Sequence, residues 1–512
     1  MKETDSSNDT ATEETMPELA GTAKRHARPD LIPIPSSDPA DPYNWPSWKK
    51  HALLLQVAFH AMMGPFLAAA VIPAFLAFAE DFNISITQAS YFVSVQIIFL
   101  GTAPLFWAPV ANRVGRRPVY LISTLGAAVC TFAGAYCHSY GTLMILRVLQ
   151  SIMISPPQSI GSSSIKEMFF EHERGQKMGI WLMFVTLGPP IAPFIFGFVV
   201  QRTSWHWIFW AISIVHLLEF LLYFFCGPET LFDRPLPEEN QRDSKSPKPR
   251  LGSSLDLEKY TTPTATKTQA KALRQQYLSF PRLGKAPWSH VPIEIVKPLA
   301  MFARLPVFLP SLAYTIFFTY SNVLLTVEIP ALLGVEYHLD PQAMGLQFIA
   351  PILGCMLGEP IAGYGSDRFM AWRRRQGKRE PEARLWLGMP GFLLGIVGLV
   401  VFGVQLQNTR AAGRWNVTPD IGTAITFFGL QLVSTVAVTY AVESQTSDRG
   451  QDAALFIGWF RQTVAFTGPF YFNKQYAAMG PARASGLLAG LVGGASTLIV
   501  ATIIFGKRWR GA

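Results

Sequence analysis

The pattern of hydrophobic and polar positions divides the chain into twelve long apolar runs separated by polar loops. The hydrocarbon core of a bilayer is about 30 Å thick, so a helix needs about 20 mostly apolar residues to cross it. The runs are too long and too uniformly apolar for the strands of a membrane barrel. We therefore predict an all-α membrane protein with twelve transmembrane helices. The runs are 53–79, 91–111, 119–138, 142–165, 178–200, 205–226, 306–333, 343–366, 385–405, 420–442, 453–476 and 484–505.

One long polar segment precedes the first run, and another divides the runs into two groups of six. Residues 1–46 are rich in acidic residues, Pro, Ser and Thr, a composition that predicts a disordered N-terminal tail. Residues 228–302 are also polar and charged, and we interpret them as a flexible central loop. The expected domains are then a six-helix bundle at 47–227, a second at 303–508 and a short C-terminal tail at 509–512.

The distribution of charge sets the orientation. A net charge of +9 would suggest nucleic acid as the partner of a soluble protein, but here Lys and Arg gather in loops beside apolar runs, so we expect no nucleic-acid partner. Basic loops stay in the cytoplasm. One side carries the basic loops around residues 113–117, 166–177 and 368–384, and the other side has few basic residues. We therefore expect both termini and the central loop to be cytoplasmic, in a multi-pass protein of the plasma membrane.

Two sequons fall in the expected exterior loops, at Asn83-Ile-Ser85 and Asn416-Val-Thr418. Asn-X-Ser/Thr is the acceptor pattern for N-glycosylation. Each sequon is close to the end of a run, and the pattern also arises by chance. Asn83 and Asn416 are therefore candidate glycosylation sites, with a chance match as the alternative.

A short motif is repeated at corresponding places in the two halves. Ala108-Pro-Val-Ala-Asn112-Arg113-Val-Gly115-Arg116-Arg117 follows the second run, and Gly363-Tyr-Gly-Ser-Asp367-Arg368 follows the eighth. The halves therefore look like a tandem duplication of a six-helix unit. Parallel repeats with a binding site near the bilayer midplane between them are an architecture of secondary transporters.

These loops resemble the major facilitator superfamily, in particular its fungal twelve-span drug:proton antiporter group, whose loop reads G-x-x-x-D-R-x-G-R-R. The first copy keeps the Arg, Gly, Arg and Arg but has Asn112 in place of Asp, so it lacks the ionic form of the motif. The second copy keeps the leading Gly, the Asp and the Arg. The resemblance implies a cytoplasmic latch and hinge, and a simple positive-inside anchor is the alternative. The loop residues concerned are Asn112, Arg113, Gly115, Arg116, Arg117, Gly363, Asp367 and Arg368.

Two further motifs lie inside the runs. Arg147-Val-Leu-Gln150-Ser151 resembles the family's R-x-x-Q-G, which implies a role of Arg147 in proton coupling. Gly188-Pro189-Pro190-Ile-Ala192-Pro193, followed by Gly197, resembles the antiporter motif G-P-x-x-G-P. Small residues let helices approach closely and Pro kinks them, so this fifth helix can seal one half against the other.

Ionisable residues inside a membrane span are costly and indicate function by default. The best carboxylates for proton exchange are Glu328 and Glu359, and Glu359 beside Pro360 could instead brace the hinge. His60 either faces the cavity or packs in the core, whereas we interpret His216 and Glu219 as a structural pair. The candidates for proton coupling or the substrate cavity are Arg147, Gln150, Glu328, Glu359, Asn322 and His60, with Arg461 and Gln462 as weaker ones.

The function that these features favour is proton-coupled efflux of a small lipophilic or cationic molecule, such as a drug, toxin or secondary metabolite, by alternating access. One alternative is proton-coupled uptake of a nutrient such as a polyamine, and another is a non-transporting membrane sensor. The sequence has no P-loop, metal-ligand spacing or nucleophile elbow. We therefore expect no enzyme activity, cofactor or metal, and a monomer whose partners are its substrate, protons and the bilayer.

Overall fold

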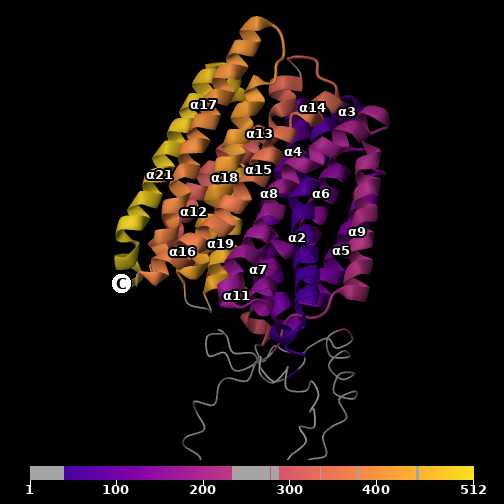
Figure 1. Ribbon diagram of the computed structural model, residues 1–512. Coiled ribbons are helices and arrows are strands. Elements are labelled where there is room, and N and C mark those ends of the chain that lie inside the picture. Colours follow the sequence, from indigo (N-terminus) through magenta and orange to yellow (C-terminus); the bar gives the residue numbers. More distant parts are fainter. Residues whose placement is uncertain are drawn as a thin grey trace, which may run out of the picture.

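The computed structural model of the protein describes residues 38, 40–232, 277, 287–334, 336–376, 380–445 and 449–511. Across these ranges the chain forms helices joined by turns and loops, without any β-strand. Figure 1 shows the indigo and magenta helices of the first half beside the orange and yellow helices of the second half. We call the end of the molecule that carries Arg113, Arg117 and Arg368 the basic end.

The first half packs as a set of paired helices. Helix α2 lies along α8, α5 lies along α9, and α6 contacts both α4 and α5. Gly115 separates α4 from α5 with φ 106°, a left-handed conformation that favours glycine. The elements are α2 (Ser47–Ala69), η3 (Ile72–Ala74), α3 (Phe75–Asp81), α4 (Ile86–Val114), α5 (Arg116–Gly134), α6 (Tyr140–Ile154), α7 (Pro157–Met168), α8 (Glu171–Arg202) and α9 (His206–Cys226).

The second half has the same kind of packing with more interruptions. Helix α17 contacts α18 and α21, α15 contacts α18, and α12 contacts α21. The elements are α12 (Leu305–Phe318), η6 (Thr319–Val323), α13 (Leu324–Val327), η7 (Pro330–Gly334), α14 (Pro341–Leu346), α15 (Ile349–Pro360), η8 (Ile361–Gly365), α16 (Ser366–Arg375), η9 (Pro381–Gly388), α17 (Met389–Ala412), α18 (Thr418–Glu443), α19 (Gly450–Ala465), η10 (Gly468–Phe470), α20 (Phe472–Met479) and α21 (Pro481–Gly511).

The described residues include nine helical stretches that are long and apolar enough to cross a membrane. The other three predicted spans have shorter or broken helices. Run 119–138 is α5, which has 19 residues and begins with two arginines. Run 142–165 is broken between α6 and α7, because Pro156 and Pro157 have no backbone N–H to continue the helix. Run 453–476 is divided between α19 and α20. The all-α membrane fold is thus confirmed, and twelve spans in two bundles stays a prediction.

The end of the predicted N-terminal tail is ordered where the structure describes it. Residues 1–37 lie outside the described residues. Pro42–Asn44 form a 3-10 turn, η2. The Tyr43 ring stacks on Phe170 at 4.9 Å, and its hydroxyl donates to the Lys166 carbonyl at 2.7 Å. The prediction of disorder up to residue 46 is therefore wrong for residues 40–46, because Tyr43 and Trp45 are buried.

The end of the central loop is also helical. Residues 233–276 and 278–286 lie outside the described residues. The chain then forms η4 (Trp288–His290), α11 (Val291–Val296) and η5 (Lys297–Ala303). Helix α11 packs against α4, and η5 packs against α19. The expectation of a flexible loop through residue 302 is therefore wrong for residues 287–302.

Candidate functional site

A cavity lies between the two halves of the protein. Its larger compartment comprises about 620 Å³ of atom-free space, part of it open to solvent, between α4, α7 and α8 on one side and α18 and α19 on the other. A second compartment, of about 390 Å³, lies between α2, α4 and α8 and the segment α12–η6–α13 with α19. Leu100 and Gln462 line both compartments, which we together call the central cavity.

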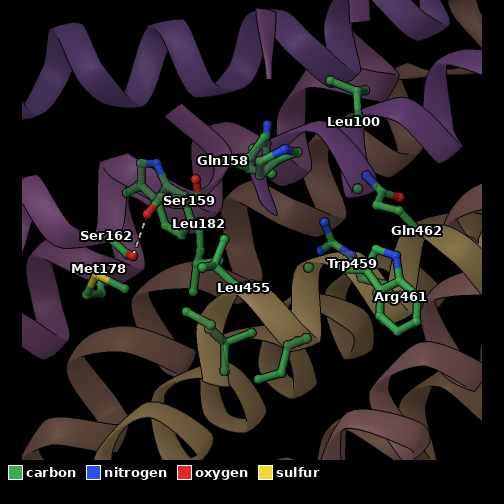
Figure 2. Close-up of a pocket in the computed structure, with 18 residues that line it drawn as sticks. Leu100, Gln158, Ser159, Ser162, Met178, Leu182, Leu455, Trp459, Arg461 and Gln462 are labelled. Atoms are coloured by element: carbon green, nitrogen blue, oxygen red, sulfur yellow. Dashed lines mark hydrogen bonds between the residues drawn. The ribbon is translucent and has the colours of Figure 1, made fainter. Parts of the chain in front are cut away.

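The wall of the central cavity is mostly apolar, with a few polar groups. Figure 2 shows Gln158, Ser159 and Ser162 of α7 and, from α19, Arg461 and Gln462. Gln158 donates to the Ala61 carbonyl at 2.6 Å, so its amide is already used within the protein. The buried polar atoms of the wall that have no hydrogen-bond partner are Trp181 Nε1, Asn322 Nδ2, Thr326 Oγ1, Arg461 Nε and Gln462 Oε1.

Among the candidates from the sequence, Asn322 lines this cavity, and so do the weaker candidates Arg461 and Gln462. The remaining candidates lie elsewhere. The residues of the two compartments do not include Arg147, Gln150, Glu328, Glu359 and His60.

Arg147 lies in α6 and is fully buried. Its guanidinium donates to the carbonyls of Leu67 and Ala68 at 3.0 Å and to that of Phe92 at 3.3 Å. Leu67 and Ala68 belong to the last turn of α2, where carbonyls lack helical partners and the helix dipole is negative. The compensation for the charge of Arg147 is therefore the end of α2. The structure does not bring Arg147 to Glu328 or Glu359, and no ion pair of Arg147 occurs among the described residues.

Two glutamines, Gln96 and Gln150, form a hydrogen-bonded network next to Arg147. Gln96 of α4 donates to the Arg147 carbonyl at 3.3 Å and to Gln150 Oε1 at 3.2 Å. Gln150 in turn donates to the Cys130 carbonyl at 3.2 Å. Sequence reasoning missed Gln96, although a glutamine within an apolar run was a signal that could have found it.

Glu359 lies at the contact between the halves. One carboxylate oxygen accepts hydrogen bonds from Gln431 and, at 3.2 Å, from Thr435, both on α18. The other oxygen faces Gly179 of α8, where a side chain larger than hydrogen would overlap with it. Glu359 thus contacts α8 of the first half at a position that only glycine leaves free.

Glu328 follows α13 directly and is buried. Its Oε1 atom has no hydrogen-bond partner. The preceding residues, Thr326 and Val327, line the central cavity. Glu328 is therefore a buried carboxyl group next to the cavity wall.

His60 faces α5 and α9. Its Nε2 lies 3.2 Å from Ser123 Oγ, and its ring packs against both Tyr120 and Tyr223 at 5.7 and 5.5 Å. These contacts correspond to the packing alternative for His60. On α9, His216 and Glu219 form a buried pair at 2.9 Å.

The first loop motif forms a dense polar cluster at the basic end. Arg113 pairs with Glu294, and Arg116 pairs with Glu167 at 2.9 Å. Arg116 also donates to Asn112 Oδ1 at 2.7 Å. Arg117 donates to the carbonyls of Gly227 and Phe224 at the end of α9, both at 2.8 Å.

The start of α5 is capped by Glu229. Its carboxylate accepts from the backbone N–H groups of Arg116 at 2.9 Å and Arg117 at 3.0 Å. An anion at a helix N-terminus is favourable because the unpaired N–H groups and the dipole are positive there. Burial nevertheless raises the pKa of the Glu229 carboxyl above its ordinary value of 4.5, and these N–H groups oppose that rise.

The second loop motif uses a different set of partners. Asp367 pairs with Arg384 at 3.1 Å, and Arg384 also reaches Glu443 at 3.2 Å. The Asp367 carboxylate fills the space beside Gly175 of α8, while Arg368 is exposed. Gly363 faces Glu359, where a Cβ atom would lie 2.8 Å from the carboxylate. The second motif therefore also contacts the first half through α8.

Helix α8 carries the motif around Gly188. A Cβ atom on Gly188 would lie 2.7 Å from the Met62 carbonyl of α2, and one on Gly197 would lie 2.5 Å from the Pro341 carbonyl of α14. Pro189 lines the central cavity, and a Cβ atom on Gly345 would lie 2.8 Å from the Pro193 carbonyl at the same crossing. The helix thus packs closely on both halves.

Asn83 and Asn416 lie exposed in the loops that follow α3 and precede α18. Asn83 has φ 52° and ends the turn after α3. Asn416 accepts a hydrogen bond from the backbone N–H of Thr418 at 3.0 Å. Their glycosylation stays a prediction.

An α-helical protein with nine candidate membrane spans in its described residues, and with a cavity between its halves, belongs to the class of multi-pass membrane proteins. Residues 57–469 match the family model of the Major Facilitator Superfamily. The chain belongs to this family of transporters, which confirms the resemblance seen in the loop motifs.

Relatives in fungi cover nearly the whole chain. An uncharacterised transporter of Schizosaccharomyces pombe is 27% identical over 93% of this chain and 91% of its own. The MFS antiporter QDR3 of Candida albicans is 23% identical over 94% of this chain and 80% of its own. The cycloheximide resistance protein of Candida maltosa is 25% identical over 86% and 76%. The protein is thus similar over most of its length to fungal proteins that include a transporter, an antiporter and a resistance protein.

Proposed function

We propose that the protein exports a small lipophilic molecule in exchange for protons, by alternating access of two six-helix bundles. The observation that carries this proposal is the central cavity, which has a mostly apolar wall and is lined by both halves. Such enclosed apolar sites with a few polar groups are typical of small-molecule binding. We place the protein in the plasma membrane as a monomer, with both termini and the central loop in the cytoplasm.

The relatives and α8 support export as the direction of transport. The names of two relatives describe an antiporter and a resistance protein, which is compatible with export. The close packing of Gly188 and Gly197 agrees with an α8 that seals the halves against each other. Uptake of a polyamine is less compatible with the site, because the charged residue in the cavity wall is an arginine.

Proton coupling is best assigned to Glu359. An ionised carboxylate is costly to bury, whereas a protonated one is much less so. Protonation of Glu359 therefore favours the closed contact with Gly179, and ionisation favours its opening. Substrate that prefers one of these states would couple the two flows. Glu328 is a second carboxyl group that could take part in this exchange.

The test uses purified protein in vesicles with an imposed pH gradient. Comparing medium and cytosol of cells with and without the gene identifies a transported compound, which is then offered to the vesicles. We expect uphill movement that a protonophore abolishes, and Glu359→Gln should allow downhill exchange only. Glu336→Gln, at an exposed ion pair with Arg410, serves as the control and should behave as wild type. Uphill movement that ignores the pH gradient would refute proton exchange.

A further inference from the structure

The central cavity has an unbalanced charge. Among the described residues that line its two compartments, Arg461 is the one charged side chain, and neither Asp nor Glu is present. Arg461 is buried, with 9% of its surface exposed. A guanidinium remains charged at physiological pH, so this wall carries a fixed positive charge.

The partners of Arg461 leave much of its hydrogen-bonding capacity unused. Its Nη1 donates to the Tyr314 hydroxyl at 2.7 Å, and its Nε has no partner. The guanidinium carbon lies 4.4 Å from the centre of the Phe318 ring and 5.6 Å from that of Tyr314. Ring faces attract a cation, but they leave its N–H groups without acceptors. In the described part of the chain, Arg461 has no carboxylate within ion-pair distance.

Arg147 provides an internal comparison. Both arginines are buried, but the Arg147 guanidinium donates to three main-chain carbonyls at the end of α2 and near it. Arg461 has a neutral hydroxyl in place of those acceptors. The protein therefore provides hydrogen-bond acceptors for Arg147, outside the cavity lining, but leaves N–H groups of Arg461, in the cavity wall, available to a ligand.

Other polar groups line the adjoining compartment, and Gln462, whose Oε1 has no partner, connects the two. Asn322 Nδ2 and Thr326 Oγ1 are buried in the wall without partners. Gln462 follows Arg461 and lines both compartments. The rest of the wall includes the apolar surfaces of Trp181 and Trp459. The central cavity thus combines a cation, the Asn322 amide donor and the unpaired Gln462 amide oxygen with a mostly apolar wall.

We infer that the substrate is a lipophilic organic acid, whose carboxylate pairs with Arg461 while its apolar body fills the cavity. A charge-assisted hydrogen bond between a guanidinium and a carboxylate is stronger than a neutral one and has a matching planar geometry. This inference deepens the proposed export function and replaces the expectation of a cationic substrate. A cationic substrate would be repelled by Arg461, and no described carboxylate lines the cavity to compensate for this repulsion.

The test is binding of matched probes to the purified full-length protein in nanodiscs, measured by equilibrium dialysis. Three probes with the same body are compared: 4-phenylbutyrate, 4-phenylbutyramide and 4-phenylbutylamine. The acid should bind about tenfold or more tightly than the amide, which corresponds to about 1.4 kcal/mol, and the amine should bind most weakly. A tighter amine, equal affinities, or no binding of the acid would overturn the inference.

Substitutions test whether Arg461 is responsible for the preference for the acid. Arg461→Gln should weaken binding of the acid about tenfold and leave the amide unchanged, so retained amide binding shows that the site is folded. Arg461→Lys should keep part of the preference, since it keeps the charge but loses the planar fork. Arg202→Gln removes an exposed arginine outside the cavity and should change nothing. A preference for the acid that survives in Arg461→Gln would overturn the assignment.

The two proposals fail separately. Binding needs no pH gradient, so a protein that prefers the acid but does not pump it keeps this inference and refutes proton-driven export. A protein that pumps amines against a gradient, without any effect of Arg461→Gln, keeps the export proposal and refutes the acid.

Discussion

Arg113 and Glu294 form a bidentate ion pair, in which Nη1 meets Oε2 and Nη2 meets Oε1, both at 2.8 Å. The pair joins the end of α4 to α11, the helix that follows the central loop. Three residues after Glu294, Lys297 reaches Asp452 of α19 at 3.2 Å. The segment 287–303 is therefore fastened to both halves of the protein at the basic end.

Breaking this pair should loosen the segment. Glu294→Gln removes the charge that fixes Arg113, so we expect faster hydrogen exchange in residues 287–303 and slower transport at similar expression. Arg113→Ala should have at least the same effect, because it also removes the hydrogen bond to the Pro287 carbonyl. Adding Glu294→Gln to Arg113→Ala should change little, because the ion pair is already lost. The matched control is Glu336→Gln, which breaks an ion pair with Arg410 elsewhere. Additive effects of the two changes would show that Arg113 acts independently of Glu294.

The same pair should be insensitive to pH in the physiological range. The hydrogen bonds from Arg113 lower the pKa of the Glu294 carboxyl below its ordinary value of 4.5. A lowered pKa means that the stabilisation is complete above the ordinary value and is lost as pH falls through the lowered one. A fluorophore attached at His290→Cys should thus report an unchanged environment between about pH 5.5 and 7.5. A transition within this window would assign proton sensing to the segment.

Asn112→Asp should be tolerated. Asn112 Oδ1 accepts from Arg116 Nη1 at 2.7 Å, and a carboxylate in its place would accept the same hydrogen bond with charge assistance. Because Asn112 is exposed, we expect a gain of stability of only about 0–1 kcal/mol and normal transport. Asn112→Leu, which removes the acceptor, is the contrasting variant. Thermal unfolding and transport are measured on both, and an inactive Asn112→Asp protein would show that the loop works differently.

Gly197→Ala should impair transport without preventing folding. Its new methyl group would meet the Pro341 carbonyl and Gly345 of α14, at the crossing of the two halves. We expect poorer closure of this end and a severalfold loss of transport rate. Gly490→Ala has open space around it and is the control. Equal rates for the two variants would mean that α8 does not need this close contact.

The positions of the helices could be predicted from the sequence better than the contacts between their side chains. The apolar run 91–111 corresponds to α4, and the loop motifs mark its end correctly, since Gly115 is needed for the turn. The break after α6 was missed although Pro156 and Pro157 indicate it. The acceptors of Arg147 were not predictable, because they are main-chain carbonyls whose availability depends on where α2 ends. Tyr43 was assigned to a disordered tail because its partner, Phe170, is distant in sequence.

Arg147 could act either as the counter-charge of a glutamate or as the residue that binds the end of α2, and mutations distinguish the two roles. If it were the counter-charge of Glu359 or Glu328, removing both charges together would cost less than removing either alone. The structure predicts otherwise, since its guanidinium donates to the carbonyls of Leu67, Ala68 and Phe92. Arg147→Ala leaves the carbonyls of Leu67 and Ala68 at the end of α2 buried and unpaired, and each costs about 1–3 kcal/mol. We expect loss of stability and of uphill transport.

The decisive measurement is a double-mutant cycle on Arg147 and Glu359, scored by thermal stability and by uphill transport in vesicles. Arg147→Lys should retain part of both, because an ammonium reaches fewer carbonyls than the guanidinium fork. Arg147→Gln combined with Glu359→Gln should be as impaired as the sum of the single changes, because the two residues have separate partners. Rescue in the double variant would show that Arg147 and Glu359 pair in another conformation of the transport cycle. Additivity would instead assign Arg147 to fixing the end of α2, whose residues Ala68 and Ala69 line the central cavity.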